Sequence, residues 1–139
     1  MPTGLEFKDI AERRLEEALV LHSAGKYDGA YYLAGYVIEC ALKAAISTHL
    51  NYEIYAGMDG ELSNFRTHKL SKLVIFAGFV KGLAETLDPK LKSAYSYITS
   101  QTDGWSEVKR YEPIACSKQK CDSFLESVQI LMQWIRQHW

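Results

Sequence analysis

The run GKYDGAYYLAGYVIECALKA, residues 25–44, decides the fold of this chain. When residues 27–50 are placed on a helix, apolar side chains point in nearly every direction, whereas a surface helix carries one apolar stripe. Small residues recur in this run at three- and four-residue steps, which lets neighbouring helices approach closely. The run therefore predicts a helix at the centre of a bundle.

Glu39 interrupts this apolar helix one turn before Lys43. A buried carboxylate is costly unless a basic group pairs with it. One interpretation is a surface glutamate that pairs with Lys43 at i,i+4, which contributes about 0.2–0.5 kcal/mol. The other is a carboxylate that holds an incoming basic side chain. Arg110 is the candidate partner, because arginine is always charged and pairs in a bidentate manner.

Four further helices are predicted around the central one by the spacing of apolar residues. The short Gly25-Lys26 connection makes the first two helices antiparallel neighbours. Asp88-Pro89 is a helix start signal, and residues 51–65 have the composition of a loop. The predicted helices cover residues 7–24, 27–50, 68–80, 89–100 and 117–138. The expected fold class is all-α, an up-and-down bundle of about five helices in a single domain over residues 1–139.

Composition and charge narrow the class of protein. The chain has 139 residues, of which 47% are hydrophobic and 24% charged, as in an ordinary globular domain. Its net charge of -1 disfavours a dedicated duplex-DNA binder but leaves room for a local basic pocket. No apolar run is long enough to cross a bilayer, and the N-terminus has no secretory signal pattern, so we expect a cytoplasmic protein without membrane contact.

Metal and cofactor chemistry is not indicated by the sequence. The three cysteines have no Cys-x-x-Cys spacing and the four histidines are scattered, so we expect reduced thiols, no metal and no cofactor. A glycine-rich phosphate loop, a nucleophile elbow and a paired-carboxylate motif are also absent from the sequence. No catalytic residue is therefore predicted.

The segment from Trp105 to Pro113 carries candidate ligand-binding residues in a connection between two helices, where function often lies. In the functional interpretation Arg110 and Lys109 hold a phosphate, and Tyr111 or Trp105 stacks on a base. In the alternative, Trp105 and Tyr111 cover the end of the bundle and Arg110 caps helix carbonyl groups.

His68 belongs to a second candidate segment. Thr67 is the predicted N-cap of the third helix, and a helix N-terminus flanked by Arg66, His68 and Lys69 is a reasonable anion site. The alternative is a structural or solvated histidine. A third group consists of tyrosines at helical spacing, which are expected to be core or a dimer interface rather than a base-stacking platform. These tyrosines are Tyr27, Tyr31, Tyr32 and Tyr36.

The run of residues 25–44, the segment HKLSKL at residues 68–73 and the segment from Trp105 to Tyr111 together resemble HEPN domains, small helical modules named as nucleotide-binding. The resemblance covers most of the chain. It implies a compact helical bundle, commonly dimeric, with a link to RNA or nucleotide handling. Many relatives are toxins, or partners of a minimal nucleotidyltransferase in two-gene modules.

The resemblance also bears on catalysis. Catalytic HEPN proteins are metal-independent ribonucleases that carry an arginine followed four to six residues later by a histidine, near the start of the last helix. Arg110 matches the arginine, but residues 111–117 read YEPIACS, and no other arginine has a histidine at that spacing. The resemblance therefore carries over Glu39 and Arg110 as the polar pair of the family pocket, but not the histidine.

The favoured hypothesis is a non-catalytic HEPN-type domain that binds a nucleotide or RNA. It acts as a homodimer or with a nucleotidyltransferase, in a toxin-antitoxin-like pair. One alternative is a ribonuclease with a rearranged site that uses His68 beside Arg110. Another is a protein interaction module that uses Tyr31, Tyr32 and the small-residue face. The candidate ligand-binding residues are Glu39, His68, Trp105, Lys109, Arg110 and Tyr111.

Overall fold

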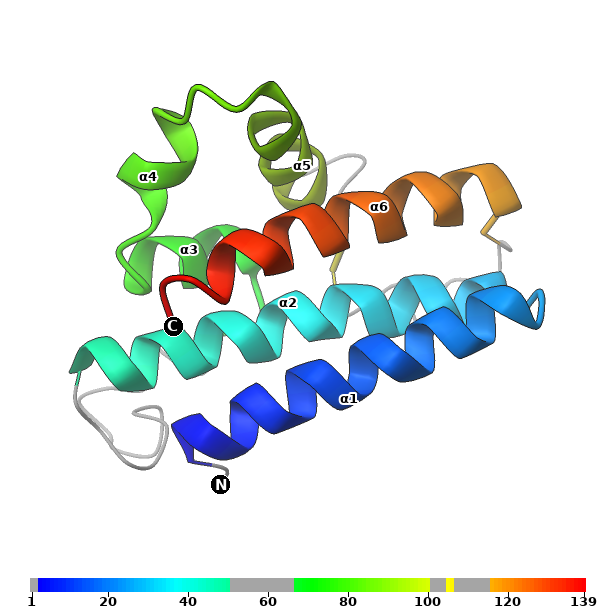
Figure 1. The fold of residues 1–139 in the computed structure, drawn as a ribbon, viewed down its shortest axis with the longest axis horizontal. Helices are drawn as coiled ribbons and strands as arrows, with labels where there is room; N and C mark the ends of the chain where they lie inside the picture. Colours follow the sequence, from blue (N-terminus) through cyan, green and yellow to red (C-terminus); the bar gives the residue numbers. More distant parts are fainter. Residues whose placement is uncertain (1–2, 51–66, 101–104, 107–115) are drawn as a thin grey trace.

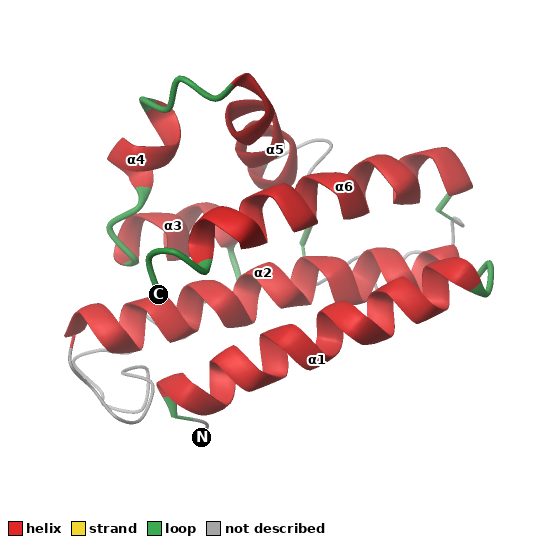
Figure 2. Ribbon diagram, viewed as in Figure 1, coloured by secondary structure: helices red, strands yellow, loops and turns green. Residues whose placement is uncertain are grey.

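The computed structural model of the chain describes residues 3–50, 67–100, 105–106 and 116–139. Within these residues the secondary structure consists of six helices and no strand, which confirms the predicted all-α class (Figure 2). The helices are α1 (Gly4–Ser23), α2 (Tyr27–Leu50), α3 (Leu70–Phe76), α4 (Val80–Ala84), α5 (Pro89–Thr99) and α6 (Lys118–Ile135).

Helix α2 lies between α1 and α6 (Figure 1). Helices α1 and α2 are antiparallel, as the short connection between them predicts. Helix α3 packs on α2 and α5 packs on α6, so that α3, α4 and α5 form a layer on the side of the molecule away from α1. Helix α6 runs in the same direction as α2 rather than opposite to it.

The central position of α2 follows from its sequence. Every residue from 37 to 47 is buried, which a helix achieves only when neighbours cover all of its sides. The small residues Ala30, Ala34, Ala41 and Ala44 are each 0% exposed. The predicted small-residue stripes are thus confirmed as packing surfaces, and other helices of the same chain already cover them.

Local signals fix most helix ends where they were expected. Thr3 and Glu6 form a capping box, so α1 begins three residues before the predicted start. The side chain of Asp88 accepts hydrogen bonds from the backbone N–H groups at the start of α5, and Ser117 does the same for α6. Gly25, with a φ of 76°, ends α1 in the left-handed conformation that glycine tolerates.

The third predicted helix is wrong in its extent. A single helix over residues 68–80 was expected, but α3 ends at Phe76 and α4 begins at Val80. Gly78, with a φ of 75°, makes the break, and Phe79 turns inward to pack edge-on against Trp134. The N-cap of α3 is Lys69 rather than the predicted Thr67.

No helix of the described residues combines the length and the apolarity that a membrane-spanning helix needs.

The packing of α6 gives a first test of the fold. Leu131 on α6 is 0% exposed, whereas Leu87, between α4 and α5, is 98% exposed. We expect Leu131→Ala to lower the free energy of unfolding by about 2–5 kcal/mol, because it removes apolar contacts and leaves a cavity. Leu87→Ala, the same chemical change at the surface, is expected to change it by less than about 0.5 kcal/mol. Urea unfolding measures both, and equal effects would contradict the placement of α6.

Candidate functional site

The candidate site centres on the carboxylate of Glu39, which is buried on α2 with the residue only 2% exposed. The Lys43 ammonium, one turn further along α2, donates a hydrogen bond to Oε2 of Glu39 over 3.2 Å. On the other side, Nδ1 of His68 lies 3.1 Å from Oε2 and 3.2 Å from Oε1. His68 stands two residues before α3, so the contact joins the start of α3 to the middle of α2.

The two side chains that contact Glu39 differ in their access to solvent. Lys43 is buried at 8% exposure, with its ammonium 5.9 Å from the centre of the Phe7 ring, whereas the side chain of His68 is 47% exposed. A carboxylate removed from water is tolerated only when basic groups compensate it, and Glu39 has one such group on each side. The cluster thus presents a half-exposed imidazole that a buried carboxylate holds in position.

The sequence suggested two interpretations of Glu39, a pair with Lys43 and a contact with a basic side chain from another segment, and the structure confirms part of each. The i,i+4 pair with Lys43 is present, but it is buried rather than on the surface. A basic side chain does come in from another segment, and within the described residues that side chain is His68. The predicted partner Arg110 lies outside the described residues, as do Lys109 and Tyr111.

Tyr36 and Cys40, which flank Glu39 on α2, are held in their neutral forms. Burial raises the pKa of the Cys40 thiol to about 12, and the negative charge of Glu39 adds to the rise. Burial, together with Cys40 and Glu39, also raises the pKa of the Tyr36 phenol above its ordinary value. Neither group is therefore an activated nucleophile near neutral pH.

Trp105 anchors the connection before α6 on the same face of α2. Its indole N–H donates a hydrogen bond to the carbonyl oxygen of Tyr32 over 3.1 Å, and the residue is 5% exposed. The ring lies directly on Gly35, where an added Cβ would come within 2.1 Å of the indole. Positions 32, 35 and 39 share one helix face, so the anchor and the Glu39 cluster lie along the same side of α2. An indole covered in this way offers no free face to a base, and the predicted packing role fits it better than stacking.

The structure brings Glu39 and His68 together and sets Trp105 beside them. Sequence reasoning missed two features: the burial of Lys43 and the direct contact between His68 and Glu39. The first had a signal, since Lys43 lies in a stretch where every neighbour is apolar or small. The second had none, because the residues are 29 positions apart and only the packing of α3 on α2 joins them.

The tyrosines of α2 serve mainly as packing residues. Tyr31 is 4% exposed, and its ring lies on Phe124 of α6 with the two ring centroids 4.3 Å apart. Tyr27, Tyr32 and Tyr36 are partly buried against the same core. The predicted interaction module assigns Tyr31, Tyr32 and the small-residue face to its interface. Tyr31 and the small residues are buried within the chain, so this part of the assigned surface is wrong, whereas Tyr32 is only partly buried.

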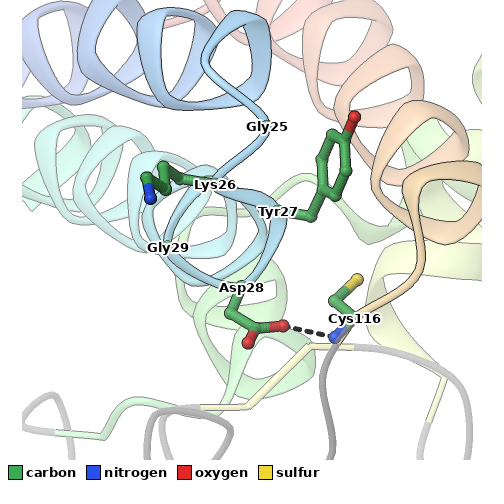
Figure 3. Close-up of a pocket in the computed structure, with 6 residues that line it drawn as sticks. All are labelled: Gly25, Lys26, Tyr27, Asp28, Gly29 and Cys116. Carbon is green, nitrogen blue, oxygen red and sulfur yellow. Dashed lines mark hydrogen bonds between the residues drawn. The ribbon is translucent and has the colours of Figure 1, made fainter.

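A separate cavity of about 320 Å³ lies at the turn between α1 and α2, lined by residues 25–29 and Cys116. Figure 3 shows Asp28, in the first turn of α2, directed at the backbone of Cys116, whose N–H donates a hydrogen bond to the carboxylate. Nearby, His22 and Lys118 pair with Asp122 and lower the pKa of its carboxyl group. The contact between Asp28 and Cys116 fixes the chain just before α6 to the start of α2, and the pair between His22 and Asp122 joins α1 to α6.

The described residues contain no group of three or more His, Cys, Asp or Glu side chains that could hold a metal ion.

The protein is thus an all-α helical bundle with a buried carboxylate on its central helix, held by basic groups from that helix and from the segment before α3. The model of the HEPN domain matches residues 5–138, and the chain belongs to this family. Searches of curated protein sequences and of solved structures returned no match to the chain.

The close contact at Gly35 provides a test of the Trp105 anchor. We expect Gly35→Ala to displace the indole and to lower the free energy of unfolding by about 1–3 kcal/mol, because the new Cβ has no room. Gly29→Ala on the same helix is the matched control, since its Cβ meets only the end of the Leu21 side chain at 3.3 Å. The measurement is urea unfolding monitored by tryptophan fluorescence, and a control as damaging as Gly35→Ala would refute the anchor.

The thiols provide a second test. Burial raises the pKa of Cys40 to about 12 and that of Cys121 to about 11, whereas Cys116 is only partly buried. Because the thiolate is the reactive form, we expect Cys116 alone to be alkylated rapidly by iodoacetamide in the native protein at about pH 8. Mass spectrometry of Cys116→Ser should show the rapid modification abolished, and rapid labelling of Cys40 would contradict its burial.

Proposed function

We propose that this HEPN domain binds a nucleotide or RNA without cleaving it, at a site formed by Glu39, His68 and the connection that contains Arg110. The observation that supports this proposal most is the buried Glu39 carboxylate, held between Lys43 and His68 beside the Trp105 anchor. Burying charges in this way adds little to the stability of a fold. Its benefit is to orient polar side chains in advance for a ligand.

In the proposed site each residue has a distinct role. Arg110 and Lys109 bind phosphate, Arg110 through bidentate hydrogen bonds, and Tyr111 stacks on a base. His68, oriented by Glu39, donates to or accepts from the ligand. Trp105 is a positioning residue, because it fixes the start of the connection to α2.

The partners in this proposal are a second copy of the chain or a minimal nucleotidyltransferase, in a toxin-antitoxin-like pair. Support for both comes from membership of the HEPN family. The sequence after Arg110 supports the non-catalytic role, because it has no histidine at the spacing that the ribonucleases of the family carry.

The first experiment is a titration of labelled single-stranded RNA and of labelled UMP with the wild-type protein and with Arg110→Ala. We expect the variant to bind at least about tenfold more weakly, which corresponds to about 1.4 kcal/mol for a lost charge-assisted contact to phosphate. The same samples on a denaturing gel should contain intact RNA.

Arg13→Ala is the control for this titration, because Arg13 is an exposed arginine on α1 whose pair with Asp9 is also exposed. It should leave the affinity unchanged. Equal affinities of the wild type and Arg110→Ala would refute the assignment of the site, and an equal loss in both variants would indicate a nonspecific charge effect.

A second candidate function, a metal-independent ribonuclease with a rearranged site, is favoured by the contact between His68 and Glu39. A carboxylate that holds one nitrogen of an imidazole fixes its tautomer and leaves it able to act as a general acid or base. This candidate requires RNA cleavage that is lost in both His68→Ala and Arg110→Ala. Intact RNA on the gel with the wild-type protein rejects it.

A further inference from the structure

Charge is divided between the two sides of the bundle. Helix α1 carries five carboxylates and three lysine or arginine side chains. Residues 67–100, which include α3, α4 and α5, carry five lysines and only two carboxylates, Glu85 and Asp88. The net charge of -1 for the whole chain therefore conceals a basic layer on the side of α2 away from α1.

The five lysines of this layer are all exposed and make no ion pair with any described residue. By contrast, Arg13, Arg14, Lys118 and Arg136 each pair with a carboxylate of α1 or α6. We call the five side chains the basic surface. Its members are Lys69, Lys72, Lys81, Lys90 and Lys92.

The fold itself gives no reason for the positions of several of these lysines. Lys90 and Lys92 lie at the start of α5, whose first turn contains no acidic residue and whose N-cap Asp88 supplies one carboxylate. Positive charge at a helix N-terminus is unfavourable, because the peptide dipoles already place partial positive charge there. The stability of α5 therefore does not explain lysines at these positions, whereas a bound anion would be attracted to them.

The basic surface begins at the candidate site. His68, which contacts Glu39, is followed directly by Lys69, and Lys72 lies in the first turn of α3. Helix α3 and helix α5 are in contact, and α4 contacts α5, so the remaining lysines belong to the same layer. A chain of phosphates with one nucleotide at His68 would therefore continue over a layer that carries five exposed lysines against two carboxylates.

We propose that the basic surface binds the phosphate backbone of a single RNA strand, one nucleotide of which occupies the Glu39–His68 site. The ligand is thus a strand of several nucleotides rather than a mononucleotide. This inference rests on the proposed function and specifies the class of its ligand. Each lysine that contacts a phosphate releases counterions, so that binding weakens as salt rises.

The test compares oligouridine of about 16 nucleotides with UMP at salt concentrations between about 50 and 200 mM. We expect the wild-type protein to bind oligouridine more tightly than UMP. Lys90→Gln/Lys92→Gln should reduce the slope of log affinity against log salt by about 1.4, from about 0.7 for each phosphate contact. The wild type then loses about sevenfold more affinity than the variant over this salt range. The affinity for UMP should not change.

Lys8→Gln/Arg13→Gln on α1 removes the same charge from the opposite side and should leave the slope unchanged. Urea unfolding of both double variants checks that they fold. An unchanged slope in Lys90→Gln/Lys92→Gln, or an equal change in the α1 variant, would overturn the inference.

Two further outcomes separate this inference from the proposed function. If UMP and oligouridine bind equally well and both depend on Arg110, the proposed function stands and the basic surface is refuted. If polyglutamate displaces oligouridine at equal charge concentration, the surface accepts any acidic chain, as for an acidic protein partner, and the inference is again overturned.

Discussion

The pairing of Glu39 with Lys43 and His68 is the interaction on which the arrangement of this protein depends. Helix α2 is buried on all sides over residues 37–47, so an uncompensated carboxylate there would oppose the packing of every helix around it. Lys43 supplies one compensating group from within α2. His68 supplies the other from the segment before α3, which ties the position of α3 to the charge on α2. The packing of α3 on α2 therefore also brings a basic group to the buried carboxylate of Glu39.

Gly35 leaves room for the Trp105 indole on the face of α2 that also carries Glu39. The absence of a side chain at Gly35 admits the indole to the helix surface, and the carbonyl of Tyr32 accepts its N–H. Asp28 holds the backbone of Cys116 at the other end of the connection. The segment that contains Arg110 thus leaves one anchor on α2 and returns to another. Its two ends are fixed by contacts that sequence separation alone would not suggest.

Much of the fold could be predicted from the sequence because the signals are local. Periodicity located α2 and α6, and the caps at Asp88 and Ser117 set two helix starts. The break at Gly78 was missed although the glycine is itself a local signal, because one glycine within an apolar pattern does not show that a helix ends there. The inward turn of Phe79 toward Trp134, which lies 55 positions later, has no local signal. The same limit applies to the site. Glu39 was found from its chemical contrast with its neighbours, whereas its contact with His68 arises only when α3 packs on α2.

Among the described residues, the division of charge across the bundle corresponds to an electric dipole between α1 and the layer of α3, α4 and α5. In the field of a polyanion such a molecule turns before it makes contact, so that the layer of α3, α4 and α5 arrives first and α1 faces away. Orientation during approach raises the fraction of encounters that are productive, and dissolved ions weaken it over roughly 10 Å at about 0.1 M salt. A nearly neutral protein can in this way combine rapid capture of an anionic strand with little nonspecific attraction on its other side.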